Sequence, residues 1–232
     1  MKSGNKNEQR NHQNKHPRPS PSNPQMTDNK DKIILDLCGG TGAWSKPYKD
    51  AGYDVRLLTL PDCDITLTIF DTDWMFFRDA KRTMFGKVRY KDVWGILAAP
   101  PCTEFSLAKS TKPRNFEEGI RVVRSCLDII WYCRVKAMIK WWAMENPRGF
   151  LRQFMGKPAF QFEQWEFGHK GVKPTDIWGY FNEPKKKVKM KPEGLSKYYP
   201  GGSRNGLGWS KNSVERAITP AGFAKAFYEA NK

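Results

Sequence analysis

The chain has 232 residues, of which 39% are apolar and 13% aromatic, enough to bury the core of one ordinary domain. No stretch approaches the roughly 18 consecutive apolar residues of a membrane-spanning helix, and the polar N-terminus lacks the apolar core of a secretory signal. The formal net charge of +16 favours a polyanionic partner over the alternative of a generally basic soluble protein, so we expect a cytoplasmic protein that meets nucleic acid.

Residues 1–31 are rich in Asn, Gln, Lys, Pro and Ser and almost free of apolar side chains. Such a segment cannot bury enough surface to offset the entropy of ordering, so we expect a disordered, mildly basic tail. Next, the apolar run 33–37 predicts a buried parallel strand, since glycines follow it directly. A helix over 44–51 and a second strand over 55–60 are expected after it.

The middle of the chain continues this alternation. The aromatic-rich stretch 71–85 predicts a helix, 93–99 a buried strand, 117–140 a helix with apolar residues near helical spacing, and 141–145 a further strand. Strands that alternate with helices predict an α/β fold, in which a mainly parallel sheet is covered by helices on both faces.

The last part of the chain has three features. Segments 160–167 and 175–181 alternate as a strand pair would. Residues 182–211 are rich in Gly, Pro and Lys and predict a basic loop or very small subdomain. A helix over 219–230, with Pro220 in its first turn, is expected at the end.

The first predicted strand runs into a glycine-rich turn, from Asp36 through Cys38 to Gly42. The pattern is neither a dinucleotide fingerprint nor a phosphate-binding loop, because it lacks their glycine spacing and their lysine. A strand end, an acidic residue and a tight turn suit a small zwitterionic ligand such as S-adenosylmethionine, although glycines needed only for packing are the alternative. Thr59 or Asp62 is a candidate for its ribose and Asp64 for its adenine.

The run Pro100-Pro101-Cys102 follows another buried strand. Two prolines fix the backbone just before the thiol, which has little use in a core cysteine but suits a nucleophile. The chain has five cysteines and no CxxC pair, which argues against a disulfide framework and a zinc site. Cys126 and Cys133, on the long predicted helix, fit the ordinary buried role instead.

Glu145 and Asn146 directly follow a third apolar strand. Because the carboxyl ends of parallel strands meet at one edge of a sheet, we expect them to face the same crevice as Cys102. Glu145 can protonate or hydrogen-bond a ring nitrogen, and Asn146 can hold the loop. A simply capped strand end is the alternative.

In order and approximate spacing, the segments 36–42, 100–102 and 145–146 resemble motifs I, IV and VI of the cytosine-C5 DNA methyltransferases. Asp64-Ile65 resembles motif III, and 216–223 resembles motif X. The resemblance is to a compact phage- or bacterial-type member, and it implies a Rossmann-like, class I S-adenosylmethionine-dependent fold. It also implies covalent attack by Cys102 on carbon 6 of a cytosine flipped out of double-stranded DNA.

The resemblance implies an organisation of four parts: the tail 1–31, a catalytic cofactor-binding domain 32–181, a minimal target-recognition segment 182–211, and a returning C-terminal helix within 212–232. The implied catalytic residues are Pro101, Cys102, Glu145 and Asn146. The implied cofactor-binding residues are Asp36, Cys38, Gly39, Gly40, Thr41, Gly42, Trp44, Asp62, Asp64 and Pro100. The expected nucleic-acid contacts are Ser106, Lys109, Lys112, Arg114, Arg148, Lys173, Lys185, Lys186 and Lys187.

Three features depart from the family pattern. Pro147 stands where the Glu-Asn pair is usually followed by Val, and Lys173 is our candidate in place of a clear arginine-rich motif VIII. About thirty residues stand where family members carry a long recognition region. They are basic, and phosphate contacts do not read sequence, so we expect weak sequence selectivity.

Two other functions fit the same residues. One keeps the chemistry on RNA or a free pyrimidine nucleotide, and the other is a nucleic-acid-binding module on a decayed methyltransferase scaffold. Survival of Cys102 and Glu145 argues against the second, since a binding module needs neither. We expect a monomer without a metal, because His12, His16 and His169 offer no metal cluster.

Overall fold

The computed structural model describes residues 1, 29–109, 112–169, 171–193 and 217–232. Almost all of the predicted tail, and residues 194–211 of the predicted basic segment, lie outside the described residues. The same holds for Arg216, the first residue of the motif X resemblance.

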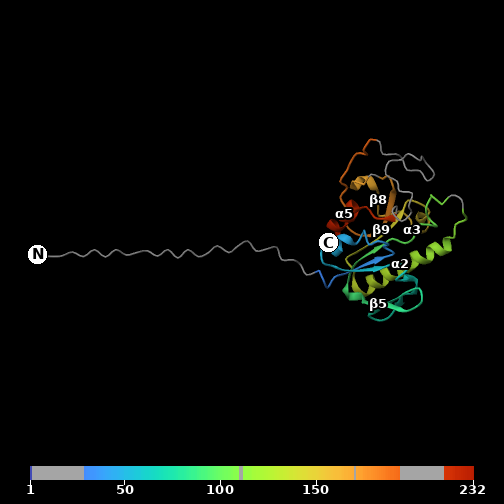
Figure 1. The fold of residues 1–232 in the computed structure, drawn as a ribbon, viewed down its shortest axis with the longest axis horizontal. Coiled ribbons are helices and arrows are strands. Elements are labelled where there is room, and N and C mark those ends of the chain that lie inside the picture. Colours follow the sequence, from blue (N-terminus) through green and yellow to red (C-terminus); the bar gives the residue numbers. More distant parts are fainter. Residues whose placement is uncertain (2–28, 110–111, 170, 194–216) are drawn as a thin grey trace.

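A mixed sheet forms the centre of the fold (Figure 1). It has six strands, in the order β2-β1-β6-β7-β9-β8. Its strands are β1 (Ile33–Leu37), β2 (Asp54–Leu58), β6 (Val93–Ala98), β7 (Trp141–Pro147), β8 (Phe160–Glu163) and β9 (Pro174–Tyr180). The first four in spatial order are parallel, whereas β9 runs antiparallel to both β7 and β8. The predicted α/β class with a mostly parallel sheet is confirmed, and it is consistent with a Rossmann-like fold.

The long helix α2 (Phe116–Ala137) covers one face of this sheet. Its buried side chains recur at helical spacing, from Val123 and Cys126 to Ile130 and Cys133, and they join a core with the inward residues of β1 and β6. The helix was predicted over 117–140. It ends earlier because Met138 takes a left-handed conformation, with φ of 52°.

The other face is covered by two helices, α1 (Lys46–Asp50) and α5 (Ala221–Asn231). The contact of α5 with the sheet is aromatic: Phe227 lies 5.5 Å from Trp141 of β7 between ring centroids, and 5.4 Å from Trp44, which precedes α1. Phe223 stacks on Phe162 of β8 at 4.2 Å. The predicted helix over 219–230 is therefore confirmed, with Pro220 immediately before its first residue.

The helix predicted over 71–85 is wrong. This region forms a three-stranded antiparallel sheet of β3 (Ile69–Phe70), β4 (Trp74–Arg78) and β5 (Met84–Arg89). Along β4, burial alternates with a period of two, so that Met75 and Phe77 face the core beside α2. The aromatic residues that suggested a helix face are common in strands, and this packing decides between the two conformations.

Three element ends also differ from the sequence prediction. The segment predicted as a strand over 160–167 is a strand only to Glu163, and Gln164–Phe167 forms a 3-10 helix, η3. A capping box between Glu163 and Glu166 accounts for this change, because it fixes a helical start directly after the strand. The second predicted strand ends at Leu58, and the predicted helix 44–51 is helical only over α1.

The remaining short elements are the 3-10 helices η1 (Ile65–Leu67) and η2 (Tyr90–Asp92) and the helix α3 (Leu151–Met155). Within the described ranges, no helix combines the length and apolar character needed to cross a bilayer.

The aromatic core under α5 yields a stability prediction. Phe227 is fully buried, so Phe227→Ala should leave a cavity and lower the free energy of unfolding by about 3–5 kcal/mol. Phe85→Ala, at a side chain that is 45% exposed, is the matched control and should cost far less. Denaturant unfolding measures both, and equal losses would contradict the packing of α5 against the sheet.

Candidate active site

Three strand ends meet at one edge of the six-stranded sheet. The register pairs Leu37 of β1 with Ala98 of β6, and Ala98 with Met144 of β7. The glycine turn after β1, the loop after β6 and the Glu145-Asn146 pair therefore follow at the same level of adjacent strands. Because β9 is antiparallel to β7, it contributes its beginning to this edge, and Thr175 lies opposite Pro147.

The glycine turn is fixed by its own backbone. Cys38, Gly40 and Gly42 all have positive φ, of 56°, 57° and 70°, and the Gly42 N–H donates to the Gly39 carbonyl at 3.0 Å. A side chain at Gly39 would overlap the carboxylate of Asp36, whereas one at Gly40 would meet nothing within 4 Å. The turn thus packs tightly on its inner side and is open on its outer side.

Asp36 lies beneath this turn and is fully buried. Its Oδ2 accepts a hydrogen bond from the Ser45 hydroxyl at 2.5 Å, while Oδ1 has no partner among the described residues. Desolvation raises the pKa of Asp36 to about 6, and the Ser45 hydrogen bond opposes that rise. Asp36 therefore supports the inner side of the turn through Ser45, and the outer backbone of Gly39–Gly42 is the surface that a ligand can contact.

The candidates for ribose and adenine lie beyond the end of the neighbouring strand β2. Asp62 is exposed, and Thr59 is half-buried with its carbonyl accepting from the Cys63 N–H at 2.9 Å. Asp64 caps η1, because its Oδ1 accepts from the Thr66 N–H at 3.0 Å and hydroxyl at 2.7 Å. A ligand donor would therefore approach Asp64 through its other oxygen.

Trp44 does not lie at the surface of the glycine turn. Its side chain is 2% exposed and packs on Phe223 and Phe227 of α5. This position gives it a structural role in the aromatic core, since a ligand on the turn cannot reach a side chain enclosed there.

The loop after β6 begins with the Pro100-Pro101-Cys102 run. Pro100 is buried, Pro101 is exposed and Cys102 is half-buried. The chain turns immediately after the thiol, because the Cys102 carbonyl accepts from the N–H of Phe105 at 3.0 Å and of Ser106 at 2.8 Å.

Asn146 joins this loop to β7. Its side chain is fully buried, and Nδ2 donates to the Pro100 carbonyl at 3.0 Å. Its Oδ1 has no hydrogen-bond partner within the described part of the chain. The bond sets the position of the proline pair relative to Glu145, the residue before Asn146.

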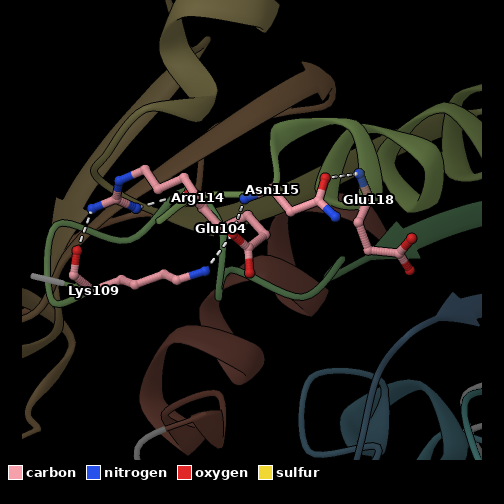
Figure 2. Close-up of polar contacts among 5 residues, drawn as sticks. All are labelled: Glu104, Lys109, Arg114, Asn115 and Glu118. Atoms are coloured by element: carbon pink, nitrogen blue, oxygen red, sulfur yellow. Dashed lines mark hydrogen bonds and ion pairs between the residues drawn. The ribbon is translucent and has the colours of Figure 1, made fainter. Parts of the chain in front are cut away.

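Lys109 and Arg114, two of the expected nucleic-acid contacts, form hydrogen bonds within the loop that leads to α2 (Figure 2). The Glu104 carboxylate accepts from Lys109 Nζ at 2.5 Å and from the Asn115 N–H at 2.6 Å. Arg114 donates to the carbonyls of Glu104 and Lys109 at 2.8 and 2.7 Å, and its guanidinium lies 4.6 Å from the Phe150 ring. The hydrogen bond from Lys109 is the main cause that lowers the pKa of Glu104.

The same loop is joined to the segment that follows β7 through Phe105, which is fully buried. The Phe105 carbonyl accepts from the Phe150 N–H at 2.8 Å, and a side chain at Gly149 would overlap that carbonyl. Sequence reasoning missed Glu104 and Asn115. One signal was present, because Asn115 precedes an acidic helix start and its side chain caps α2 by accepting from the Glu118 N–H at 3.1 Å.

Glu145 faces the beginning of β9. Desolvation raises the pKa of Glu145, Lys173 opposes the rise, and Asp176 adds to it. Glu145, Lys173, Thr175 and Thr219 line a small cavity that α5 closes through Phe223. A carboxyl group with a raised pKa stays protonated at a higher pH than usual, and in that form it can donate a hydrogen bond to a ring nitrogen.

An ion pair missed by sequence reasoning lies beside Asn146. Asp176 is fully buried, lies opposite Asn146 in the register, and accepts from Arg152 of α3 at 2.5 and 2.6 Å. The two-point contact fixes α3, and with it the backbone that follows Gly149, against β9.

The other expected nucleic-acid contacts are spread over the surface. Lys112, Lys185 and Lys187 are exposed, while Lys186 pairs with Glu166 at 2.8 Å. Arg148 donates to Gln161 at 3.4 Å, and the Ser106 hydroxyl accepts from the Ala108 N–H at 3.1 Å. Of the basic residues expected to bind nucleic acid, only Lys173 lines the cavity beside Glu145.

Comparison with known proteins assigns no family to this arrangement. No protein-family model matches the chain, and no curated protein matches it either. In the described ranges, no group of three or more His, Cys, Asp or Glu side chains is arranged to hold a metal ion.

The burial of Asp36 predicts a pH dependence of stability. The folded state binds a proton with a pKa of about 6 and the unfolded state near 3.8, so folding is favoured at low pH and loses this contribution as pH rises between them. Relative to Asp36→Asn, the wild-type free energy of unfolding should fall by about 2 kcal/mol from pH about 4 to pH about 7. Denaturant unfolding at several pH values measures the difference, and parallel curves would rule out a buried acid with a raised pKa.

Proposed function

We propose that this protein is an S-adenosylmethionine-dependent DNA (cytosine-5-)-methyltransferase, with Cys102 as nucleophile. The observation that carries the proposal is the alignment of β1, β6 and β7, which brings the glycine turn, Cys102 and Glu145 to one edge of the sheet. The bond from Asn146 to the Pro100 carbonyl supports it further, because it couples the thiol loop to the acid.

The glycine turn supports the cofactor part of the proposal. Its outer side is open at Gly40, and Asp36 braces its inner side, so backbone groups of Gly39–Gly42 would hold the amino-acid end of the cofactor. Asp64 would accept from the adenine amino group, and Thr59 or Asp62 would meet the ribose. When bound, the cofactor supplies an electrophilic methyl group.

The chemistry follows from the residues at this edge. The Cys102 thiolate would add to carbon 6 of the cytosine, forming an S–C bond and making carbon 5 nucleophilic. Carbon 5 then takes the methyl group and loses its proton, and the bond to Cys102 breaks, which restores the aromatic ring. The base must leave the duplex stack to reach such a site.

Glu145 has the environment that this reaction requires. Attack at carbon 6 places electron density on the ring, and a proton or hydrogen bond at N3 stabilises it. The desolvation that raises the pKa of Glu145 favours the protonated carboxyl that can supply it. Lys173, which lines the same cavity, would contact the base or its backbone.

DNA is the proposed substrate because the chain is strongly basic and the motif resemblance is to DNA enzymes. The short basic segment over 182–211 would give weak sequence selectivity. We also propose a cytoplasmic location, since a reducing compartment keeps Cys102 available for attack. A monomeric state is part of the same proposal.

The proposal predicts that the purified protein forms 5-methylcytosine in DNA when given labelled S-adenosylmethionine. Cys102→Ser should abolish transfer and spare cofactor binding, and Glu145→Gln should slow transfer by about 10²–10⁴-fold. Nucleoside analysis of the digested DNA measures the product, and RNA and free cytidine nucleotides are tested in parallel.

Cys133→Ala is the matched control, because Cys133 is a buried thiol on the inner face of α2 and its loss should not affect transfer. Transfer by Cys102→Ser at a rate close to that of the wild type would overturn the assignment. Cofactor binding without transfer to DNA, RNA or nucleotide would favour the decayed binding module instead.

A further inference from the structure

A pocket of about 360 Å³ lies away from the proposed active site, where the small sheet meets the end of α2. Its walls include Trp74 of β4, Arg89 of β5, Lys91 of η2 and Lys136 of α2. Thr72, Asp73 and Trp74 of its lining lie in the segment predicted as a helix, and none of the lining residues belongs to a motif singled out in the sequence.

The strand register concentrates positive charge around Trp74. Trp74 lies directly opposite Arg89, and Lys87 is two residues before Arg89 on the same face of β5. Lys87 Nζ lies 4.7 Å and Arg89 Cζ 5.4 Å from the centre of a Trp74 ring. Arg89 also pairs with Asp92 at 2.9 Å, which restricts its position.

The back of the pocket is held by stacked rings. Tyr132 of α2 stacks on Phe70 of β3 at 4.2 Å and on Tyr90 at 6.1 Å. Lys136 stands one helical turn after Tyr132, so this stacking fixes the wall from which Lys136 extends. The neighbouring residues Met75 and Val88 are buried in the same core as the inward side chains of α2, so the small sheet packs directly against this helix.

The lining has three cations, Arg89, Lys91 and Lys136, and one carboxylate, Asp73; with Asp92 on Arg89 counted as well, the cations still exceed the carboxylates by one. Clustered cations bind a phosphate, and an aromatic ring beside them offers a stacking surface to a planar base. We propose that this pocket binds one nucleotide unit of a nucleic-acid strand, with its phosphate at Lys91, Lys136 and Arg89 and its base against Trp74.

This site is distinct from the proposed catalytic edge. The pocket residues of η2 immediately precede β6, and the Cys102 loop follows its other end. Six strand residues at about 3.3 Å each separate them by roughly 20 Å. The inference concerns binding alone and holds whether or not the protein transfers methyl groups.

The test measures binding of a fluorescent single-stranded oligothymidylate at several salt concentrations, without cofactor. The double variant Lys91→Glu/Lys136→Glu should bind about tenfold more weakly at low salt, and the slope of log affinity against log salt should fall by about one or two. The matched control is Lys49→Glu/Lys225→Glu, the same charge change on exposed lysines of α1 and α5, and it should change both quantities much less. Equal losses in the two double variants would overturn the inference.

A second comparison tests the stacking surface. Trp74→Ala should weaken binding severalfold at equal net charge, and Trp74→Phe should recover most of the loss, because it keeps an aromatic ring. No difference between the two would refute a base on Trp74. Thermal unfolding of each variant checks that the small sheet remains folded.

Competing ligands show whether the pocket takes a free nucleotide or a strand, and the Lys91/Lys136 variant tests the pocket independently of the proposed function. If thymidine monophosphate competes at micromolar concentration and inorganic phosphate does not, the pocket takes free nucleotides; if only the strand binds, it is a nucleic-acid contact. Loss of binding in the Lys91/Lys136 variant of a protein that makes no 5-methylcytosine would support this inference and refute the proposed function. If the wild-type protein makes 5-methylcytosine and the Lys91/Lys136 variant binds the oligonucleotide as tightly as the wild type, the proposed function is supported and this inference is refuted.

Discussion

Parallel pairing of β1, β6 and β7 is the constraint on which the rest of the site depends. Each strand is short and buried, and the register sets Leu37, Ala98 and Met144 level with one another. Whatever follows these residues must therefore emerge at one edge of the sheet. Segments more than a hundred residues apart in sequence, from Cys38 to Glu145, become neighbours through backbone pairing alone, before any side chain of the site makes a contact.

Buried polar groups then fix what the strands bring together. Asp36 holds the glycine turn from below through Ser45, Asn146 holds the Pro100 carbonyl, and Asp176 holds α3 through Arg152. Each of these three acceptors or donors is fully enclosed, so breaking its bond leaves a desolvated polar group. The glycine turn, the thiol loop and α3 are thus positioned by three separate buried contacts.

The sequence predicted the features that depend on local pattern. Apolar runs followed by Gly-Gly, Pro-Pro or Glu-Asn marked β1, β6 and β7, because a buried strand and its abrupt end are both visible in composition. It failed where packing between distant segments decides: β4 alternates only because Met75 and Phe77 meet α2. For the same reason the sequence could not show that Trp44 packs on Phe227 or that Arg114 donates to the Glu104 carbonyl, since these partners are known only from the fold.

The central claim is that Cys102 forms a covalent bond to a cytosine held at this edge, and trapping that bond tests it most directly. With 5-fluorocytosine in an oligonucleotide, carbon 5 has no proton to lose after methylation, so the bond to the thiol cannot break. Mass spectrometry of the protein with S-adenosylmethionine should show a stable adduct carrying the oligonucleotide and one methyl group, mapped to the peptide that contains Cys102. An adduct on another residue, or none from folded protein that binds both cofactor and oligonucleotide, would contradict the account.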